Sequence, residues 1–241
     1  MSDGVFDAKV AATYDADHGG TDPAHIAQTV DVLADLADGG GALEFAIGTG
    51  RIALPLAAKD VPVSGNELSA AMVAEMRKKP GGAYIPVVIG DMCEVRSEGT
   101  FSLVFWVFNT IDNLTTQDAQ VACFQNAAAH LDPGGRFVIE TQLPPLQRLP
   151  FGETRLPFAH EPDHWGVDEF DVTTQSYSSH HLWIKDGQAQ HLSVPFRYAW
   201  PSEMDLMARI AGMTLEHRWA DWDRSLFTKD STKHVSVWRK L

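Results

Sequence analysis

Apolar and polar positions along the first 140 residues follow two patterns in turn. Short apolar runs, typical of buried strands, are separated by stretches in which apolar residues recur every three or four positions, typical of amphipathic helices. The runs lie at 42–47, 61–67, 85–89, 101–108 and 136–140. Strands that alternate with helices in this way predict a parallel sheet with helices on both faces.

Local signals mark where several of these helices begin and end. Asp22 and Pro23 are a typical cap and first-turn residue for a helix that the glycines at 39–41 would stop. Ser69 is a typical cap for a later helix. The run Asp-Pro-Gly-Gly at 132–135 predicts a turn that ends a helix before the fifth strand.

The pattern changes after Thr141. Prolines at 144, 145, 150, 157 and 162 exclude long helices, and 168–199 has the composition of several strands, with a hairpin turn at Lys185-Asp186-Gly187. We therefore expect an antiparallel β meander inserted after the fifth strand, then a capped helix over 201–211 and two closing strands. The predicted division is a core with N-terminal helices (1–150), an antiparallel β lid (151–200) and a C-terminal helix with closing strands (201–241).

The composition is that of a compact globular protein with an acidic charge balance. The formal net charge of −13 disfavours nucleic acid and anionic membranes as partners, because both are bound through clustered Lys and Arg. No apolar run approaches the roughly 18 residues of a membrane span, and Cys93 and Cys123 are too few for a disulfide framework. We expect a cytoplasmic monomer or homodimer.

Candidate chemistry centres on a glycine turn after the first strand. Gly48-Thr49-Gly50 lets a ligand approach the backbone and the amides of the next helix, as in nucleotide sites. Taken alone, the turn fits the dinucleotide fingerprint, with Glu67 placed for a ribose contact, and supports the hypothesis of an NAD(P)-dependent oxidoreductase. Glu44 favours a different ligand, because a carboxylate in the first strand would repel dinucleotide phosphates and suits a cation.

The whole set of motifs resembles the class I S-adenosylmethionine-dependent methyltransferases. It comprises the run 43–50, Glu67, Gly90-Asp91-Met92 and Pro133-Gly134-Gly135, and covers about 42–140. The resemblance implies a doubly wound, Rossmann-like, mostly parallel seven-stranded sheet and S-adenosylmethionine as the cofactor. It also implies methyl transfer to an oxygen, nitrogen or carbon nucleophile of a small molecule, because the chain is similar to bacterial enzymes that modify secondary metabolites, including amino sugars.

The resemblance further implies roles for individual residues. Gly48 and Gly50 would back the methionine part of the cofactor, Glu67 would accept hydrogen bonds from the ribose hydroxyls, and Asp91 with Met92 would fix the adenine. Glu44 would face the amino group, Tyr14 would cover the cofactor, and Ala46, where the family usually has a glycine, would offer its carbonyl. The complete predicted cofactor set is Tyr14, Glu44, Ala46, Gly48, Gly50, Glu67, Leu68, Met72, Asp91, Met92 and Phe108.

Three residues are candidates for the acceptor side. Asn109 and Asn113 follow the fourth strand at the carboxyl edge of the sheet, where ligands bind in open α/β folds. His181 lies in the meander, and one of His180 and His181 should face inward, where it could act as a general base. No side chain is assigned to catalysis, because a sulfonium is already activated and the protein can contribute mostly orientation and desolvation.

Two further hypotheses stay open at this point. A non-catalytic S-adenosylmethionine-binding protein would share the cofactor motifs but lack an acceptor pocket. A metal site is not expected, because adjacent strand residues such as His180 and His181 point to opposite faces and cannot easily share one ion.

Overall fold

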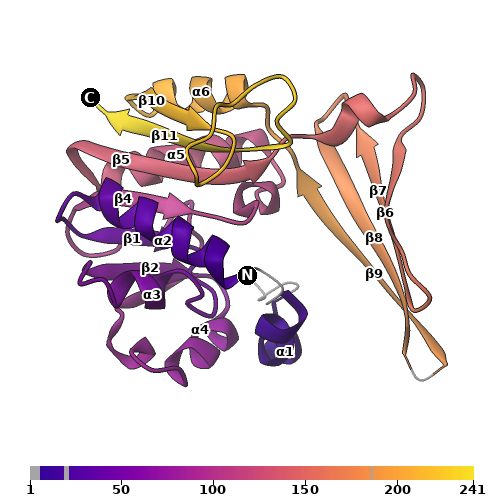
Figure 1. The fold of residues 1–241 in the computed structure, drawn as a ribbon, viewed down its shortest axis with the longest axis horizontal. Helices are drawn as coiled ribbons and strands as arrows, with labels where there is room; N and C mark the ends of the chain where they lie inside the picture. Colours follow the sequence, from indigo (N-terminus) through magenta and orange to yellow (C-terminus); the bar gives the residue numbers. More distant parts are fainter. Residues whose placement is uncertain (1–5, 19–21, 186) are drawn as a thin grey trace.

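The computed structural model describes residues 6–18, 22–185 and 187–241. A seven-stranded sheet with helices on both faces forms the larger part of the molecule, and a four-stranded sheet projects from it (Figure 1). Among the described helices, none is long and apolar enough to cross a membrane.

The large sheet has the strand order β10-β11-β5-β4-β1-β2-β3. The five strands β3, β2, β1, β4 and β5 pair in parallel, whereas β11 is antiparallel to both β5 and β10. The predicted mostly parallel seven-stranded sheet is confirmed. Its strands are β1 (Ala42–Phe45), β2 (Val63–Glu67), β3 (Val87–Ile89), β4 (Phe101–Trp106), β5 (Leu131–Gln142), β10 (Met213–Trp219) and β11 (Lys233–Lys240).

Two apolar clusters hold the helices against the sheet. Leu33, Leu56 and Met76 pack from α2, α3 and α4 against one face, while Phe124 and Met204 pack from α5 and α6 against the other. The α-helices are α1 (Ala8–His18), α2 (Pro23–Ala37), α3 (Ala53–Ala57), α4 (Ala70–Arg77), α5 (Gln117–His130) and α6 (Pro201–Ile210). Short 3-10 helices are η1 (Gly82–Tyr84), η2 (Thr110–Asn113) and η3 (Pro145–Arg148).

The cap predictions hold for two helices and fail for a third. The side chain of Asp22 accepts a hydrogen bond from the Ala24 amide, and that of Ser69 accepts one from the Met72 amide. The prediction of a capped helix at 201 was wrong in its cap, because Trp200 occupies the cap position of α6 and makes no side-chain cap bond.

The predicted turn at 132–135 is a bulge inside β5. Phe101 pairs with Leu131, whereas Leu103 pairs with Arg136, so four residues of β5 lie opposite one residue of β4 and form a bulge between the two pairs. Gly134, with φ of 80°, supplies a left-handed backbone conformation within the bulge. The helix α5 therefore ends at His130, where the chain passes directly into β5.

The four-stranded sheet is an antiparallel meander inserted after β5, as predicted. Lys185 pairs with Gln188 across the tip of the β8–β9 hairpin; Asp186 of the predicted turn lies outside the described residues, and Gly187 is left-handed with φ of 74°. The strands are β6 (Arg155–His160), β7 (His164–Asp171), β8 (Ser176–Lys185) and β9 (Gln188–Arg197).

Candidate active site

A cavity of about 560 Å³ opens at the carboxyl edge of the parallel strands. Its walls come from the ends of β1 and β2, the segments after β3 and β4, the helix α1, and the root of the β6–β9 sheet. Of the predicted cofactor set, every member except Gly50 lines the cavity: Tyr14, Glu44, Ala46, Gly48, Glu67, Leu68, Met72, Asp91, Met92 and Phe108.

The turn that contains the glycines begins at Ala46, directly after the last residue of β1. Ala46 has φ of 53°, so β1 ends at Phe45, and the Ala46 amide donates a hydrogen bond to Asn66 Oδ1 at 3.2 Å. Gly48 is left-handed at the cavity wall. Gly50 was expected to back the cofactor but lies behind the wall, where a Cβ would come within 2.7 Å of Met76 Cγ. A glycine is required at position 50 because α4 packs closely against it and because its backbone has a φ of 77°.

Glu67 joins the glycine turn to the start of α4. Its Oε2 accepts a hydrogen bond from the Gly48 amide at 2.8 Å, and its Oε1 accepts one from the Ser69 amide at 2.9 Å. Each carboxylate oxygen can accept more than one hydrogen bond. The fixed carboxylate therefore keeps capacity for ligand hydroxyls at the cavity wall.

Glu44 is a buried carboxyl with an unsatisfied oxygen. The residue is 4% exposed, and Oε2 has no hydrogen-bond partner among the described residues. Burial raises the pKa of Glu44 well above its ordinary value, although the charge of Arg51 opposes this shift. An orphan acceptor of this kind is costly unless a ligand completes it.

Arg51 brings a positive charge to the same wall. Its guanidinium lies 3.7 Å from the centroid of the Phe108 ring, in a cation–π contact. Arg51 is not among the residues predicted from the sequence. A carboxylate and a guanidinium in one wall form a matched pair for a ligand that carries both an amino and a carboxylate group.

The helix α1 covers one side of the cavity and carries Tyr14. Asp15 holds the helix to the glycine turn, accepting a hydrogen bond from Thr49 Oγ1 at 2.6 Å and pairing with Lys79 Nζ at 2.5 Å. The carbonyl of Phe6 accepts a further hydrogen bond from Ser69 Oγ at 2.6 Å. These tethers place Tyr14 in the wall of the cavity, and its covering of the cofactor stays a prediction.

Asp91 and Met92 follow β3 in a tight turn. Asp91 Oδ1 accepts a hydrogen bond from the Cys93 amide at 2.8 Å, and the Met92 carbonyl accepts one from Asn126 Nδ2 at 2.7 Å. Asp91 therefore stabilises the turn as well as lining the cavity.

Two of the three predicted acceptor-side residues line the cavity. Asn109 Oδ1 accepts a hydrogen bond from the backbone N–H of Gln142 at 2.6 Å, and Asn113 Nδ2 donates one to the backbone carbonyl of Thr110 at 3.3 Å. His181 does not line it. Its ring stacks with those of His164 and Trp183, with centroids 5.2 and 4.8 Å away, farther out on the meander.

The most unusual acidic group on the acceptor side was not selected from the sequence. Asp112, in η2, is 3% exposed and accepts a hydrogen bond from the Tyr177 hydroxyl at 2.9 Å. Burial raises the pKa of Asp112 to about 7, against the opposing effect of hydrogen bonds from Tyr177 and Gln142. Because Asp112 lies between Asn109 and Asn113, it could have been chosen from the sequence as a further acceptor-side candidate. Nothing in the sequence places Tyr177 beside it.

One group among the described residues has metal-ligand geometry, and a cation already neighbours it. The ligand atoms of His25, Glu140 and Asp221 lie within 4.8 Å of one another. Lys233 Nζ lies 2.8 Å from Asp221 Oδ2 and 4.0 Å from Glu140 Oε1. The ammonium supplies the positive charge that these carboxylates need.

Comparisons with known proteins agree with this geometry. A family model described as a methyltransferase domain matches residues 42–135. The structure of the CcbJ methyltransferase from Streptomyces caelestis is 34% identical, covers 100% of this chain and 99% of its own, and superposes with a TM-score of 0.86.

Two further relatives are named for amino sugars. A dTDP-3-amino-3,4,6-trideoxy-α-D-glucopyranose N,N-dimethyltransferase from Streptomyces venezuelae is 28% identical over 207 residues, which are 83% of this chain and 80% of the relative. The structure of CalS10, an amino pentose methyltransferase from Micromonospora echinaspora, shares the fold, with 22% identity, a TM-score of 0.68 and coverage of 95% of this chain and 97% of its own.

The fold and the cavity define an α/β enzyme with a nucleotide-type cofactor site at the carboxyl edge of its sheet. The chain belongs to the S-adenosylmethionine-dependent methyltransferases. Its cofactor is S-adenosylmethionine, and its substrate is a small molecule. This membership decides against the oxidoreductase hypothesis.

Proposed function

We propose that the protein N-methylates an amino group of a sugar-like secondary metabolite. The observation that carries the proposal is the charge of the cavity. Glu44, Glu67, Asp91 and Asp112 line it, and Arg51 is the cationic residue among its described lining residues. An acidic cavity favours a cationic cofactor and an ammonium acceptor. The names of the amino-sugar relatives support the same class of acceptor.

We assign the cofactor contacts by chemical fit. The orphan oxygen of Glu44 suits the α-amino group of S-adenosylmethionine, and Arg51 suits its carboxylate. Glu67 suits the ribose hydroxyls, while Asp91 and Met92 suit the adenine. When bound, S-adenosylmethionine supplies an electrophilic methyl group. The protein contributes orientation and exclusion of water.

The same charge pattern favours an acceptor without phosphate groups. A nucleotide diphosphate is bound most readily by clustered Arg and Lys or by free helix amides, whereas Arg51 is already placed beside Glu44 and Phe108. We therefore infer that the protein prefers a free amino glycoside to the same amino sugar linked to a nucleotide.

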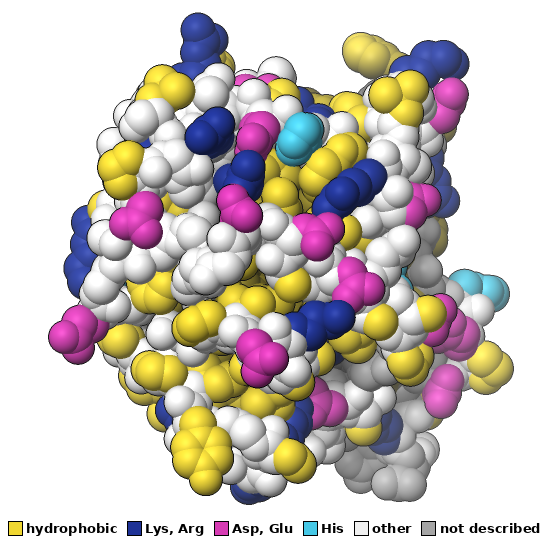
Figure 2. All heavy atoms as spheres, turned by 60° about the vertical axis from the view of Figure 1, so that its left-hand side comes forward, with side chains coloured by type: hydrophobic (Ala, Val, Ile, Leu, Met, Phe, Trp, Pro, Cys, Tyr) yellow, Lys and Arg dark blue, Asp and Glu magenta, His cyan; other side chains and the backbone are white. Residues whose placement is uncertain are grey.

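We also keep the expectation of a cytoplasmic monomer or homodimer with no nucleic-acid partner. Both cysteines are unpaired, as is usual in reducing compartments. On the face drawn in Figure 2, Lys and Arg side chains are interspersed with Asp and Glu, a distribution unlike the basic patch of a nucleic-acid-binding surface.

Calorimetric titration tests the cofactor site. We expect S-adenosylmethionine and S-adenosylhomocysteine to bind in the micromolar range and NADH not to bind. Glu67→Gln should weaken binding of the adenosyl ligands at least tenfold. The side-chain NH₂ group of the new glutamine would face the backbone N–H of Gly48 or Ser69, so that two donors would meet. Binding of NADH alone would overturn the assignment. Cofactor binding without turnover of any amine would instead favour a non-catalytic binding protein.

A further inference from the structure

We propose that Asp112 is the catalytic base of the reaction, binding the ammonium group of the acceptor and taking its proton, and that Tyr177 holds its carboxylate in place. The inference rests on the proposed N-methylation. It goes beyond the family assignment because it gives a chemical role to the junction between η2 and the β6–β9 sheet.

The order of strands separates the acceptor side of the cavity from the cofactor side. Asp91, Glu67 and Glu44 lie after β3, at the end of β2 and in β1, which are consecutive in the sheet. Asp112 follows β4, the next strand in this order, and β5 beyond it ends at Gln142. Since the carboxylates assigned to the cofactor stop at β1, Asp112 lies on the side of the cavity that is left for the acceptor.

The carboxyl group of Asp112 is buried and has no cationic neighbour among the groups that affect its pKa. It receives hydrogen bonds from the side chains of Tyr177 and Gln142, and Leu114 and Phe196 line the same cavity. A carboxylate buried without a cation is costly. An acceptor ammonium would supply that cation.

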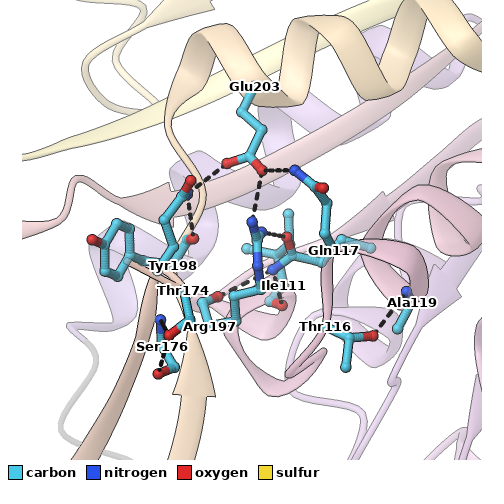
Figure 3. Close-up of polar contacts among 11 residues, drawn as sticks. Ile111, Thr116, Gln117, Ala119, Thr174, Ser176, Arg197, Tyr198 and Glu203 are labelled. Atoms are coloured by element: carbon cyan, nitrogen blue, oxygen red, sulfur yellow. Dashed lines mark hydrogen bonds and ion pairs between the residues drawn. The ribbon is translucent and has the colours of Figure 1, made fainter. Parts of the chain in front are cut away.

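The position of η2 is fixed by a polar network at the root of the β6–β9 sheet (Figure 3). The side chain of Gln120 donates hydrogen bonds to the carbonyls of Ile111 at 3.3 Å and Arg197 at 3.1 Å. Arg197 pairs with Glu203 of α6 at 2.8 Å. The segment that carries Asp112 and the sheet that carries Tyr177 are therefore held by the same side chains.

Methylation of an ammonium group requires that one proton leave the nitrogen first. An acceptor R–NH₃⁺ gives one proton to the Asp112 carboxylate, and the freed nitrogen lone pair forms the bond to the methyl carbon as the carbon–sulfur bond breaks and its electron pair stays on sulfur. The products are R–NH₂–CH₃⁺ and S-adenosylhomocysteine. Asp112 then returns its proton to water through the cavity opening, so each transfer releases one proton.

The titration of Asp112 suits this role. Its pKa of about 7 is close to the working pH that favours a general base. The titratable groups that face it are Tyr177 from β8 and Asp168 from β7, and the charge of Asp168 contributes to the upward shift. The hydrogen bond from Tyr177 acts in the opposite direction.

The test compares four forms of the full-length protein: wild type, Asp112→Asn, Tyr177→Phe and the exposed control Asp118→Asn. The acceptor probe is the methyl glycoside of 3-amino-3,4,6-trideoxyglucose, the sugar of the Streptomyces venezuelae relative. The readouts are kcat/KM as a function of pH and the Kd of S-adenosylhomocysteine.

We expect wild type and Asp118→Asn to show an inflection in kcat/KM near pH 7. Asp112→Asn should lose about a hundredfold or more in kcat/KM and lose this inflection, with the Kd changed less than about threefold. Tyr177→Phe should move the inflection to higher pH, because removing its hydrogen bond raises the pKa of Asp112. A purely structural role for the pair would not move the inflection.

Two results would overturn the inference while leaving N-methylation intact: an Asp112→Asn variant within about threefold of wild type, or an inflection that persists in it. If Asp112→Asn does not fold, as judged by loss of S-adenosylhomocysteine binding, Tyr177→Phe decides, and an unmoved inflection overturns the inference. No turnover of either the free or the nucleotide-linked amine by wild type would overturn the proposed function and the inference together.

Discussion

Asp112 shows how a residue placed for chemistry can oppose folding. Its folded-state pKa of about 7 lies above the ordinary carboxyl value, so the protonated form is favoured in the folded protein. The stability it contributes is fully present below the unfolded pKa of about 4 and is lost as the pH rises through 7. At pH 8 the folded protein therefore contains a poorly solvated charge.

Asp112→Asn should consequently stabilise the protein at alkaline pH. Replacing the buried charge with a neutral amide should raise the free energy of unfolding by about 1–3 kcal/mol at pH 8 and change it little at pH 4. Urea denaturation at the two pH values measures this difference. An equal change in the free energy of unfolding at both pH values would show that the Asp112 carboxyl does not titrate between them.

Glu44 carries the second prediction at the scale of one residue. A neutral amide in Glu44→Gln cannot pair with an ammonium group, so the variant should bind S-adenosylhomocysteine about 10- to 100-fold more weakly. Its thermal stability without ligand should not fall, because burial already disfavours the charged form of Glu44. The exposed variant Glu98→Gln is the control, and unchanged affinity in Glu44→Gln would remove Glu44 from the cofactor site.

Of the residues predicted for the cofactor site, Glu44 lines the cavity and Gly50 does not, for different physical reasons. A carboxyl inside an apolar strand is conspicuous because it needs a compensating partner. Glycines, in contrast, look alike in sequence whether they admit a ligand or a packed side chain. At Gly50 the close neighbour is Met76, which lies on another helix and could be placed only by the fold.

At the scale of elements, Glu203 of α6 anchors the root of the β6–β9 sheet. It accepts hydrogen bonds from Arg197, Gln117 and Gln175 at 2.7 to 2.8 Å. Burial would raise the pKa of Glu203, but these hydrogen bonds outweigh it and hold the pKa below its ordinary value. The stability they contribute is present above the unfolded pKa and is lost as the pH falls through the folded pKa.

Glu203→Gln should therefore destabilise the protein most at neutral pH. We expect a loss of about 1–2 kcal/mol in the free energy of unfolding at pH 7 and a much smaller loss near pH 3. Denaturation curves at both pH values provide the measurement. A loss that is independent of pH would mean that the network does not depend on the charge of Glu203.

Element boundaries were predictable where a local signal exists. Asp22 and Ser69 mark helix starts because their side chains bond to nearby amides. The bulge at 132–135 was misread as a turn, since Pro-Gly-Gly is compatible with both and only the pairing with β4 distinguishes them. The alternation of side chains along a strand predicts that one of His180 and His181 faces inward. The distance of His181 from the cavity depends on how far the β6–β9 sheet projects, which the sequence does not give.

At the scale of the molecule, the alternation of apolar runs was enough to predict the parallel sheet, and the prolines and strand composition after Thr141 predicted the inserted meander. Buried parallel strands must be nearly continuous in apolar residues, which makes them visible in sequence. The acceptor side of the cavity was less accessible. It joins Asp112 to Tyr177, 65 positions later, through contacts that exist only once two sheets are assembled.

The most direct test of the whole account is methyl transfer from isotope-labelled S-adenosylmethionine to paired acceptors, followed by mass spectrometry. The pair is the 3-amino glycoside and its 3-hydroxy analogue, with the nucleotide-linked amine as a third substrate. We predict label on the nitrogen of the free amine, slower transfer to the nucleotide-linked amine, and none to the hydroxy analogue. Transfer to the hydroxy analogue in preference to both amines would contradict the assignment of an N-methyltransferase.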